Sequence, residues 1–138
     1  NASISYSGAS YVVGTFTKNL ADVDGTTTYT HNLGVIPKYV EITCVGELNA
    51  TGDSLWTSFG RATAAGTESS VNGLKESDAG LVYTRIDTTN ILGVIRGGVG
   101  GLGEAGNINT ITATDFNITY TETVAQAVTA QCSYVVSR

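Results

Sequence analysis

One group of side chains in this sequence has the chemistry of a sugar contact. Trp56 lies close in sequence to Phe59 and Asp53. An exposed indole ring can stack on a pyranose, and a neighbouring carboxylate can accept hydrogen bonds from the sugar hydroxyl groups. A tryptophan at the rim of a hydrophobic core is the alternative interpretation. Trp56, Phe59 and Asp53 are therefore candidate ligand contacts that must be weighed against a purely structural role.

The only histidine, His31, has a side chain that can serve acid–base or nucleophilic catalysis. Its setting, Thr30-His-Asn-Leu-Gly34, is typical of a turn between two strands. There the imidazole can cap backbone groups, so we expect a structural role. The twelve carboxylates show no pairing in the sequence that would indicate a glycosidase dyad. We predict no catalytic residue.

Three further patterns resemble known sites but lack a required part. The run Gly98-Val-Gly-Gly-Leu-Gly103 matches a dinucleotide fingerprint, yet no helix and no βαβ unit follow it. Asp22-Val-Asp-Gly25 resembles the opening of a calcium loop, without a third ligand or a downstream glutamate, and is typical of a turn. One histidine and two distant cysteines do not have zinc spacing. We predict neither a cofactor nor a metal.

The elements that must position these residues are strands. Short runs rich in Val, Ile, Thr and Tyr alternate with Gly, Asn and Asp clusters, which predicts strands and turns. The best helix candidate, Val71–Glu76, is too short to be stable alone. We predict an all-β fold, an antiparallel, jelly-roll-like β-sandwich of about eight strands. The expected strands are Tyr11–Thr17, Thr26–His31, Lys38–Val45, Leu55–Phe59, Leu81–Asp87, Ile91–Arg96, Thr114–Glu122 and Ala130–Ser137.

Most of these strands have one apolar and one polar face, as in an antiparallel sandwich. The pair Leu81–Asp87 and Ile91–Arg96 is different, because apolar residues fall on both faces of this expected hairpin. One small domain normally covers only one face of a hairpin. We therefore expect another copy of the chain to cover the second face; the alternative is a strand enclosed within a thick monomer.

Cys44 and Cys132 both fall on inward faces of their expected strands. Free cysteine is among the most buried residue types, so two core thiols are the favoured interpretation. A disulfide that joins the third expected strand to the last is the alternative, and an even cysteine count does not decide between them.

Length and composition limit the remaining possibilities. A chain of 138 residues is predicted to form a single domain, 1–138, in which the glycine-rich tract 97–106 is a loop. A net charge of −5, with basic residues scattered singly, argues against nucleic-acid binding. No apolar run approaches the roughly 20 residues that cross a bilayer, so we expect no membrane insertion. The start at Asn1 and the absence of Met indicate a processed product or a fragment.

The segment Thr28–Val40 (TYTHNLGVIPKYV) resembles a recurring element of phage virion surface proteins. In that element a strand ends in His-x-Leu-Gly, two residues precede a proline, and a new strand follows. Gly34 suits a turn with positive φ, and Pro37 stands where a new strand needs no ladder donor. The runs Ile111–Thr119 and Cys132–Val136 resemble the last two strands of C-terminal modules in tail fibres, spikes and decoration proteins.

The resemblance implies a homo-oligomer, with a trimer favoured, at the virion surface and thus outside the cell. It implies other virion proteins as partners, a host surface glycan as a candidate partner, and a structural turn formed by His31, Gly34 and Pro37. The middle region, Leu48–Gly106, resembles no family element and is where receptor specificity would lie.

We therefore expect a non-enzymatic virion surface module, a tail fibre, spike or capsid decoration, that contributes to particle structure and host attachment. The alternative is a carbohydrate-binding, lectin-like domain outside a virion, with Trp56, Phe59 and Asp53 as its contact. A polysaccharide hydrolase is the less favoured third class.

Overall fold

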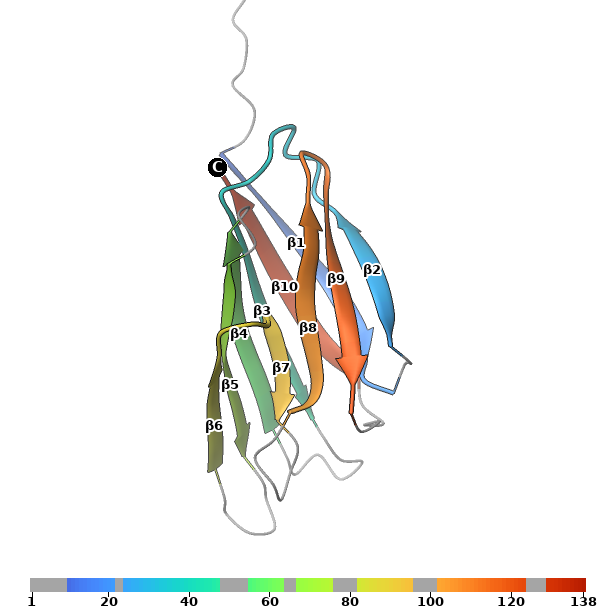
Figure 1. The fold of residues 1–138 in the computed structure, drawn as a ribbon, viewed down its shortest axis with the longest axis vertical. Coiled ribbons are helices and arrows are strands. Elements are labelled where there is room, and N and C mark those ends of the chain that lie inside the picture. Colours follow the sequence, from blue (N-terminus) through green and yellow to red (C-terminus); the bar gives the residue numbers. More distant parts are fainter. Residues whose placement is uncertain are drawn as a thin grey trace, which may run out of the picture.

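The computed structural model describes residues 10–21, 24–47, 55–63, 67–75, 82–95, 102–123 and 129–138. This part of the chain forms ten strands in two antiparallel sheets, and none of it is helical (Figure 1). The all-β prediction is therefore confirmed. The strands are β1 (Tyr11–Asn19), β2 (Gly25–Thr30), β3 (Tyr39–Glu47), β4 (Leu55–Thr63), β5 (Glu68–Lys75), β6 (Val82–Asp87), β7 (Leu92–Ile95), β8 (Leu102–Ile111), β9 (Asp115–Glu122) and β10 (Thr129–Ser137).

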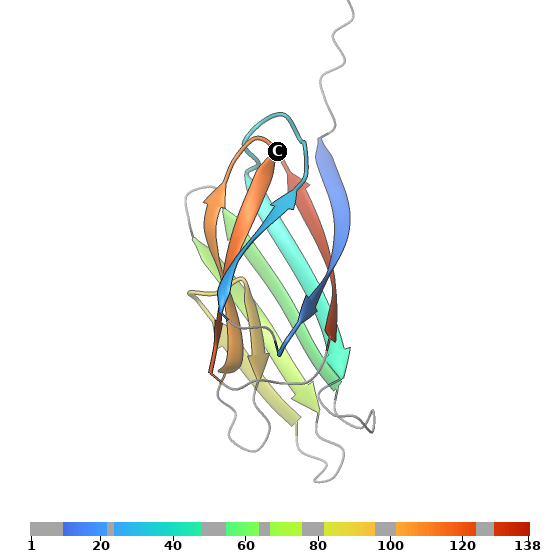
Figure 2. The ribbon, with the colours of Figure 1, turned by 90° about the vertical axis from the view of Figure 1, so that its right-hand side faces the viewer.

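The two sheets face each other as a β-sandwich (Figure 2). The six-stranded sheet has the order β1-β10-β3-β4-β5-β6, and the four-stranded sheet has the order β2-β9-β8-β7. The first strand of each sheet pairs with a strand from the end of the chain, which is the jelly-roll-like feature of the fold. Between these nested pairs, consecutive strands form meanders in both sheets.

Alternation along the strands produces the core between the sheets. In β4 and β10, every second side chain is buried and the others are exposed or partly exposed, which follows from the two-residue period of a strand. The largest fully buried side chains come from both sheets and include Trp56, Ile42, Leu74, Phe116 and Ile118.

Two strands are absent from the sequence prediction. The helix candidate Val71–Glu76 is wrong over its described residues, because β5 continues to Lys75 with alternating burial. β8 begins at Leu102, so the predicted loop 97–106 is wrong from that residue onward, while 97–101 lie outside the described residues. Both strands contain several small or polar residues, which hid them from a search for Val- and Ile-rich runs.

The predicted hairpin of 81–87 with 91–96 does not form. β6 pairs with β5 at the edge of the six-stranded sheet, whereas β7 pairs with β8 in the other sheet. The chain changes sheets at Asp87, whose Oδ1 accepts hydrogen bonds from the backbone N–H groups of Thr89 and Asn90 at 2.8 and 3.0 Å. Burial alone would raise the pKa of this carboxyl, but these hydrogen bonds outweigh it and hold the pKa below its usual value.

β7 is enclosed within the monomer. Its four residues, Leu92–Ile95, are all buried, and it packs against β4 and β5. A partner copy is thus not needed to cover β7, contrary to the expectation for this strand. The surplus apolar residues that do stay exposed lie on β6, where Val82 and Ile86 face solvent.

The contact between β4 and β7 is very close. The Trp56 indole Nε1–H donates a hydrogen bond of 2.9 Å to the Gly93 carbonyl, and the Gly93 N–H donates one of 3.3 Å to the Ser58 hydroxyl. At Gly60, an added Cβ atom would lie 1.5 Å from the Ile91 carbonyl oxygen. Only a residue without a side chain can therefore occupy position 60.

The two cysteines form a disulfide, so the favoured prediction of two core thiols is wrong and its alternative is correct. Cys44 on β3 lies directly opposite Cys132 on β10, with their Cα atoms 4.1 Å apart. Both lie on the buried face, as the alternation predicted. The bond closes a loop between residues separated by 88 positions.

Gly60→Ala tests the close contact between the sheets. The added methyl group meets backbone atoms that cannot rotate away, so we expect the free energy of unfolding to fall by about 3 kcal/mol. Gly25→Ala is the control, because nothing lies within 4 Å of its added Cβ. Urea denaturation measures both variants, and equal stabilities would contradict the described approach of Ile91 to Gly60.

Removal of the disulfide should be costly because it closes a long loop. We expect Cys44→Ala/Cys132→Ala to lose about 4 kcal/mol of stability, chiefly because the unfolded chain gains entropy. Urea denaturation of the wild-type protein, with and without reductant, should show a loss of stability in reductant equal to that of the double variant. Identical unfolding midpoints in the two conditions would show that the thiols are free.

Candidate functional site

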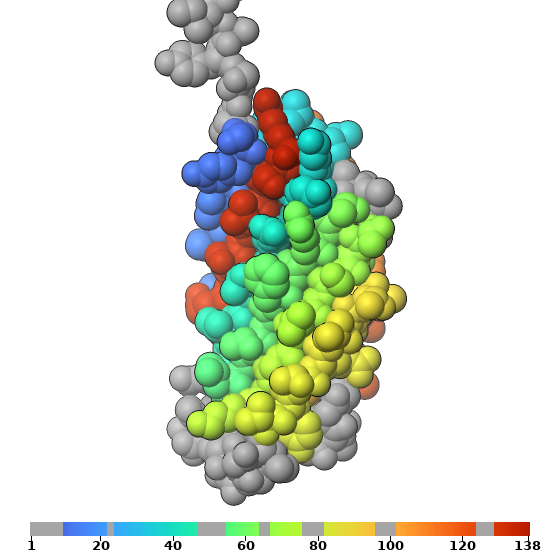
Figure 3. All heavy atoms as spheres, turned by 90° about the vertical axis from the view of Figure 1, so that its left-hand side faces the viewer, coloured from blue at the N-terminus to red at the C-terminus, as the bar shows by residue number. Residues whose placement is uncertain are grey.

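The outer face of the six-stranded sheet carries the clearest candidate contact surface. Figure 3 shows this face, with β1 at one side and β6 at the other. Phe59, Val71 and Ile86 lie on it and are 52%, 55% and 75% exposed. Large apolar side chains are normally scattered singly over a protein surface, so a continuous group of them calls for an explanation.

These three residues form one row across three strands, here called the apolar row. Phe59 on β4 is opposite Val71 on β5, and Val71 is opposite Ile86 on β6. Directly opposite residues of an antiparallel sheet have their side chains in contact range. The row borders a hollow of about 200 Å³, which Arg61 and Ser69 also line.

The same strands point polar side chains into the sandwich. Ser58 on β4 and Ser70 and Asn72 on β5 are buried, although their outward neighbours in the row are apolar. The inward groups satisfy one another: the Ser58 hydroxyl donates to Asn72 Oδ1 at 2.6 Å, and Asn72 Nδ2 donates to Ser70 Oγ at 3.0 Å. The usual polar-out, apolar-in pattern is thus locally reversed in this part of the sheet.

Glu68 is a further inward polar group and links the two sheets. Its side chain accepts hydrogen bonds from the Ile108 backbone N–H, at 2.9 Å, and from the Asn107 side-chain amide, both on β8. Burial raises the pKa of the Glu68 carboxyl, and these hydrogen bonds oppose the rise. The reversed pattern therefore rests on hydrogen bonds that hold β5 in this register.

Charges on the outer face are of both signs. Arg61 Nε lies 3.5 Å from Glu41 Oε1, and its guanidinium lies 3.7 Å from the centre of the Tyr39 ring. Lys75 is exposed at the end of β5. The described residues around the apolar row thus carry charges of both signs, although the whole chain is negative.

The candidate sugar contacts do not come together. Trp56 is 0% exposed and belongs to the core, while Phe59, three residues later, points to the opposite side of the sheet. Asp53 lies outside the described residues. The ring-stacking role proposed for Trp56 is therefore wrong, because its ring is enclosed and its N–H is bonded to Gly93. Of the three residues, Phe59 is on a solvent-facing surface.

The structure places His31, Gly34 and Pro37 in the connection between β2 and β3. The buried His31 ring accepts a hydrogen bond from the Leu33 N–H through Nδ1, at 3.1 Å. The His31 N–H donates to the Thr114 carbonyl at 2.7 Å, and the Gly34 N–H donates to the Ala113 carbonyl at 2.9 Å. Gly34 has φ of 81°, a conformation that favours glycine.

The sequence analysis found only part of the apolar row on the outer face of the six-stranded sheet. It noted the apolar residues on both faces of 81–87, which include Ile86, but it took Val71 for part of a helix candidate. The signal for Val71 was its alternation with Ser70 and Asn72, because such a two-residue period indicates a strand.

Within the described ranges, no group of three or more His, Cys, Asp or Glu residues could hold a metal ion, and no helix could span a membrane.

Trp56→Phe should destabilise the protein, because it leaves the buried Gly93 carbonyl without its donor. We expect a loss of about 2 kcal/mol, against less than about 1 kcal/mol for Phe59→Ala on the exposed face. Urea denaturation gives both values. The emission of the single tryptophan should also be blue-shifted in the folded protein; a spectrum like that of the unfolded chain would contradict its burial.

No protein-family model matches the chain, and no curated protein sequence matches it.

Proposed function

We propose that this protein is a non-enzymatic surface module of a phage virion, a tail fibre, spike or capsid decoration, that contributes to particle structure and host attachment. It assembles as a homo-oligomer through the outer face of its six-stranded sheet. The apolar row carries the assembly part of the proposal. The resemblance of Thr28–Val40 to virion surface proteins supports the location, and the turn geometry of His31 and Gly34 is compatible with that element.

The apolar row supports burial of this face because the local pattern is reversed. Inward polar groups such as Asn72 need hydrogen bonds within the sandwich, whereas outward Val71 and Ile86 gain only when they are removed from water. The hydrogen bonds of the inward groups serve the monomer, but the exposure of the apolar row does not add to its stability. A partner that covers the row removes apolar surface from water at about 25 cal/mol per Å².

A second copy of the chain is the partner that fits this face. Two copies with a net charge of −5 each repel unless the meeting surfaces are locally balanced. The outer face has Arg61, Lys75 and Glu41, so two copies can meet there without facing like charges everywhere. The low charged fraction of the chain, 14%, agrees with extensive contact between subunits.

Val71→Lys tests the assembly, because it places a charge at the centre of the apolar row. We expect association at least about tenfold weaker, since a lysine would be desolvated without a partner. Thr121→Lys is the matched control: it adds the same charge at an exposed strand position of the other sheet. Analytical ultracentrifugation at micromolar concentration should give a multiple of the 14.3 kDa chain mass for wild type, three times for a trimer.

The location is tested with labelled protein. It should bind to virions stripped of their surface proteins or to cells of the host bacterium, and Val71→Lys should reduce the oligomer without unfolding the chain. A wild-type protein that is monomeric would overturn the assembly part. A protein that binds neither particles nor cells would overturn the virion part.

A further inference from the structure

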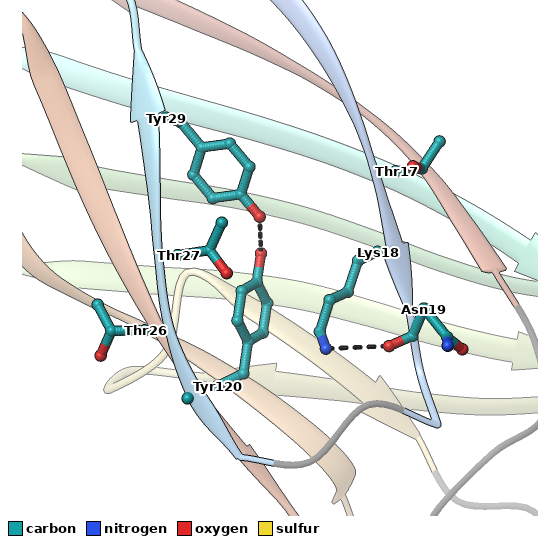
Figure 4. Close-up of a pocket in the computed structure, with 8 residues that line it drawn as sticks. Thr17, Lys18, Asn19, Thr26, Thr27, Tyr29 and Tyr120 are labelled. Atoms are coloured by element: carbon teal, nitrogen blue, oxygen red, sulfur yellow. Dashed lines mark hydrogen bonds between the residues drawn. The ribbon is translucent and has the colours of Figure 1, made fainter.

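A second surface feature lies at the opposite edge of the sandwich, where the two sheets begin. β1 and β2 are consecutive in the chain but are edge strands of different sheets. Between them is a hollow of about 370 Å³, within the range of small-molecule sites. Figure 4 shows Lys18 from β1, Thr27 and Tyr29 from β2, and Tyr120 from β9, which direct their side chains into this space.

The inner wall of this hollow, here called the edge pocket, is polar. Lys18 is 7% exposed; its ammonium donates a hydrogen bond of 2.9 Å to the Asn19 carbonyl and lies 3.5 Å from a carboxylate oxygen of buried Glu104. The same ammonium lies 4.7 Å from the centre of the Tyr120 ring. The hydroxyls of Tyr29 and Tyr120 are 2.7 Å apart.

Stability does not explain this arrangement. Lys18 occupies an inward position of β1, two residues after Phe16, where an apolar side chain would continue the core. A buried ion pair gives no more stability than well-packed apolar residues of similar volume, because both charges must leave water. Polar groups that cost free energy beside an open hollow are typical of a binding site.

The chemistry of the wall selects an uncharged, hydroxyl-rich ligand. The charges of Lys18 and Glu104 offset each other, so neither an anion nor a cation is favoured. Burial raises the pKa values of Tyr29 and Tyr120 further above neutral pH, where a phenol is protonated in any case. Because the two hydroxyls bond each other, one hydroxyl hydrogen and the oxygen lone pairs remain for a ligand. Thr27 adds a hydroxyl that can donate or accept, and the tyrosine rings add apolar surface.

We infer that the edge pocket binds a neutral sugar unit. Sugars present hydroxyl groups that both donate and accept, together with apolar C–H faces, and this combination matches the wall of the pocket. The inference names a site for the host-attachment part of the proposed function and rests on it. It places the sugar contact at Lys18, Tyr29 and Tyr120, none of which is a residue that the sequence suggested.

The test uses the full chain and six neutral sugars found on bacterial surfaces: glucose, galactose, mannose, rhamnose, N-acetylglucosamine and N-acetylgalactosamine. Amide NMR shifts report binding at each described residue. We expect at least one sugar to shift β1 and β2 resonances in a saturable way, with glucuronic acid and glucosamine binding at least about tenfold more weakly than that sugar. No saturable shift with any neutral sugar, or preference for a charged one, would overturn the inference.

Variants separate binding from folding. Tyr29→Phe should weaken binding about tenfold through loss of one hydroxyl, whereas Tyr83→Phe, a partly buried tyrosine on β6, should leave it unchanged. The pair Lys18→Met/Glu104→Leu should keep or raise the unfolding temperature yet abolish binding. Binding that survives in this double variant would overturn the role of the polar wall.

Failure of sugar binding in the edge pocket can be told apart from failure of assembly or of particle binding. Val71→Lys should change the oligomer mass but leave sugar shifts in the edge pocket intact. An intact oligomer that binds particles but no sugar overturns the pocket alone. A monomer that binds no particle or cell but still binds sugar in the edge pocket overturns the virion module and retains the sugar site.

Discussion

The contact between β4 and β7 is the constraint on which the rest of the sandwich depends. β7 is only four residues long and is buried on both sides, so its backbone groups must find partners or close packing inside the protein. Trp56 and Ser58 supply those partners at Gly93, and Gly60 permits the close approach of Ile91. Because these inward positions of β4 are committed to β7, Leu55 and Phe59 must point outward.

This commitment explains why hydrophobicity alone does not predict the orientation of β4. The inward side of β4 carries one large residue, Trp56, beside small ones at 58, 60 and 62, and the outward side carries Leu55 and Phe59 beside the charged Arg61. Since both faces mix apolar and polar residues, a rule that turns the more apolar face inward does not decide the orientation of the strand. The actual orientation depends on β7, whose Gly93 bonds to residues 35 and 37 positions earlier in the sequence and which is positioned by its pairing with β8.

The strands that the sequence predicted well are those with an apolar face against the core and a polar face on the other side. β3, β9 and β10 have Val, Ile, Phe and Tyr at alternate positions, and the core lies where these residues indicate. β5 and β8 were missed because their interiors contain Ser, Asn and Gly, which tertiary hydrogen bonds stabilise in the structure. To predict the disulfide, one must also know the register that sets Cys44 opposite Cys132. Strand alternation shows which face a residue is on, but it does not show which residue lies opposite. Lys18 gave a usable signal, a charge in phase with Phe16, but the predicted strand ended one residue before it.

The disulfide has a mechanical consequence. It joins β3, early in the chain, to β10, the last strand, and the segment between the two cysteines contains β4 to β9. Tension that pulls the two ends of the chain apart passes from Cys44 to Cys132 through the covalent bond and does not extend the backbone of that segment. Of the described strands, only β1, β2 and the parts of β3 and β10 outside the bridge can be extended while the bond is intact. Six of the ten described strands, including the three that carry the apolar row, therefore cannot be drawn out by pulling on the two ends of the chain.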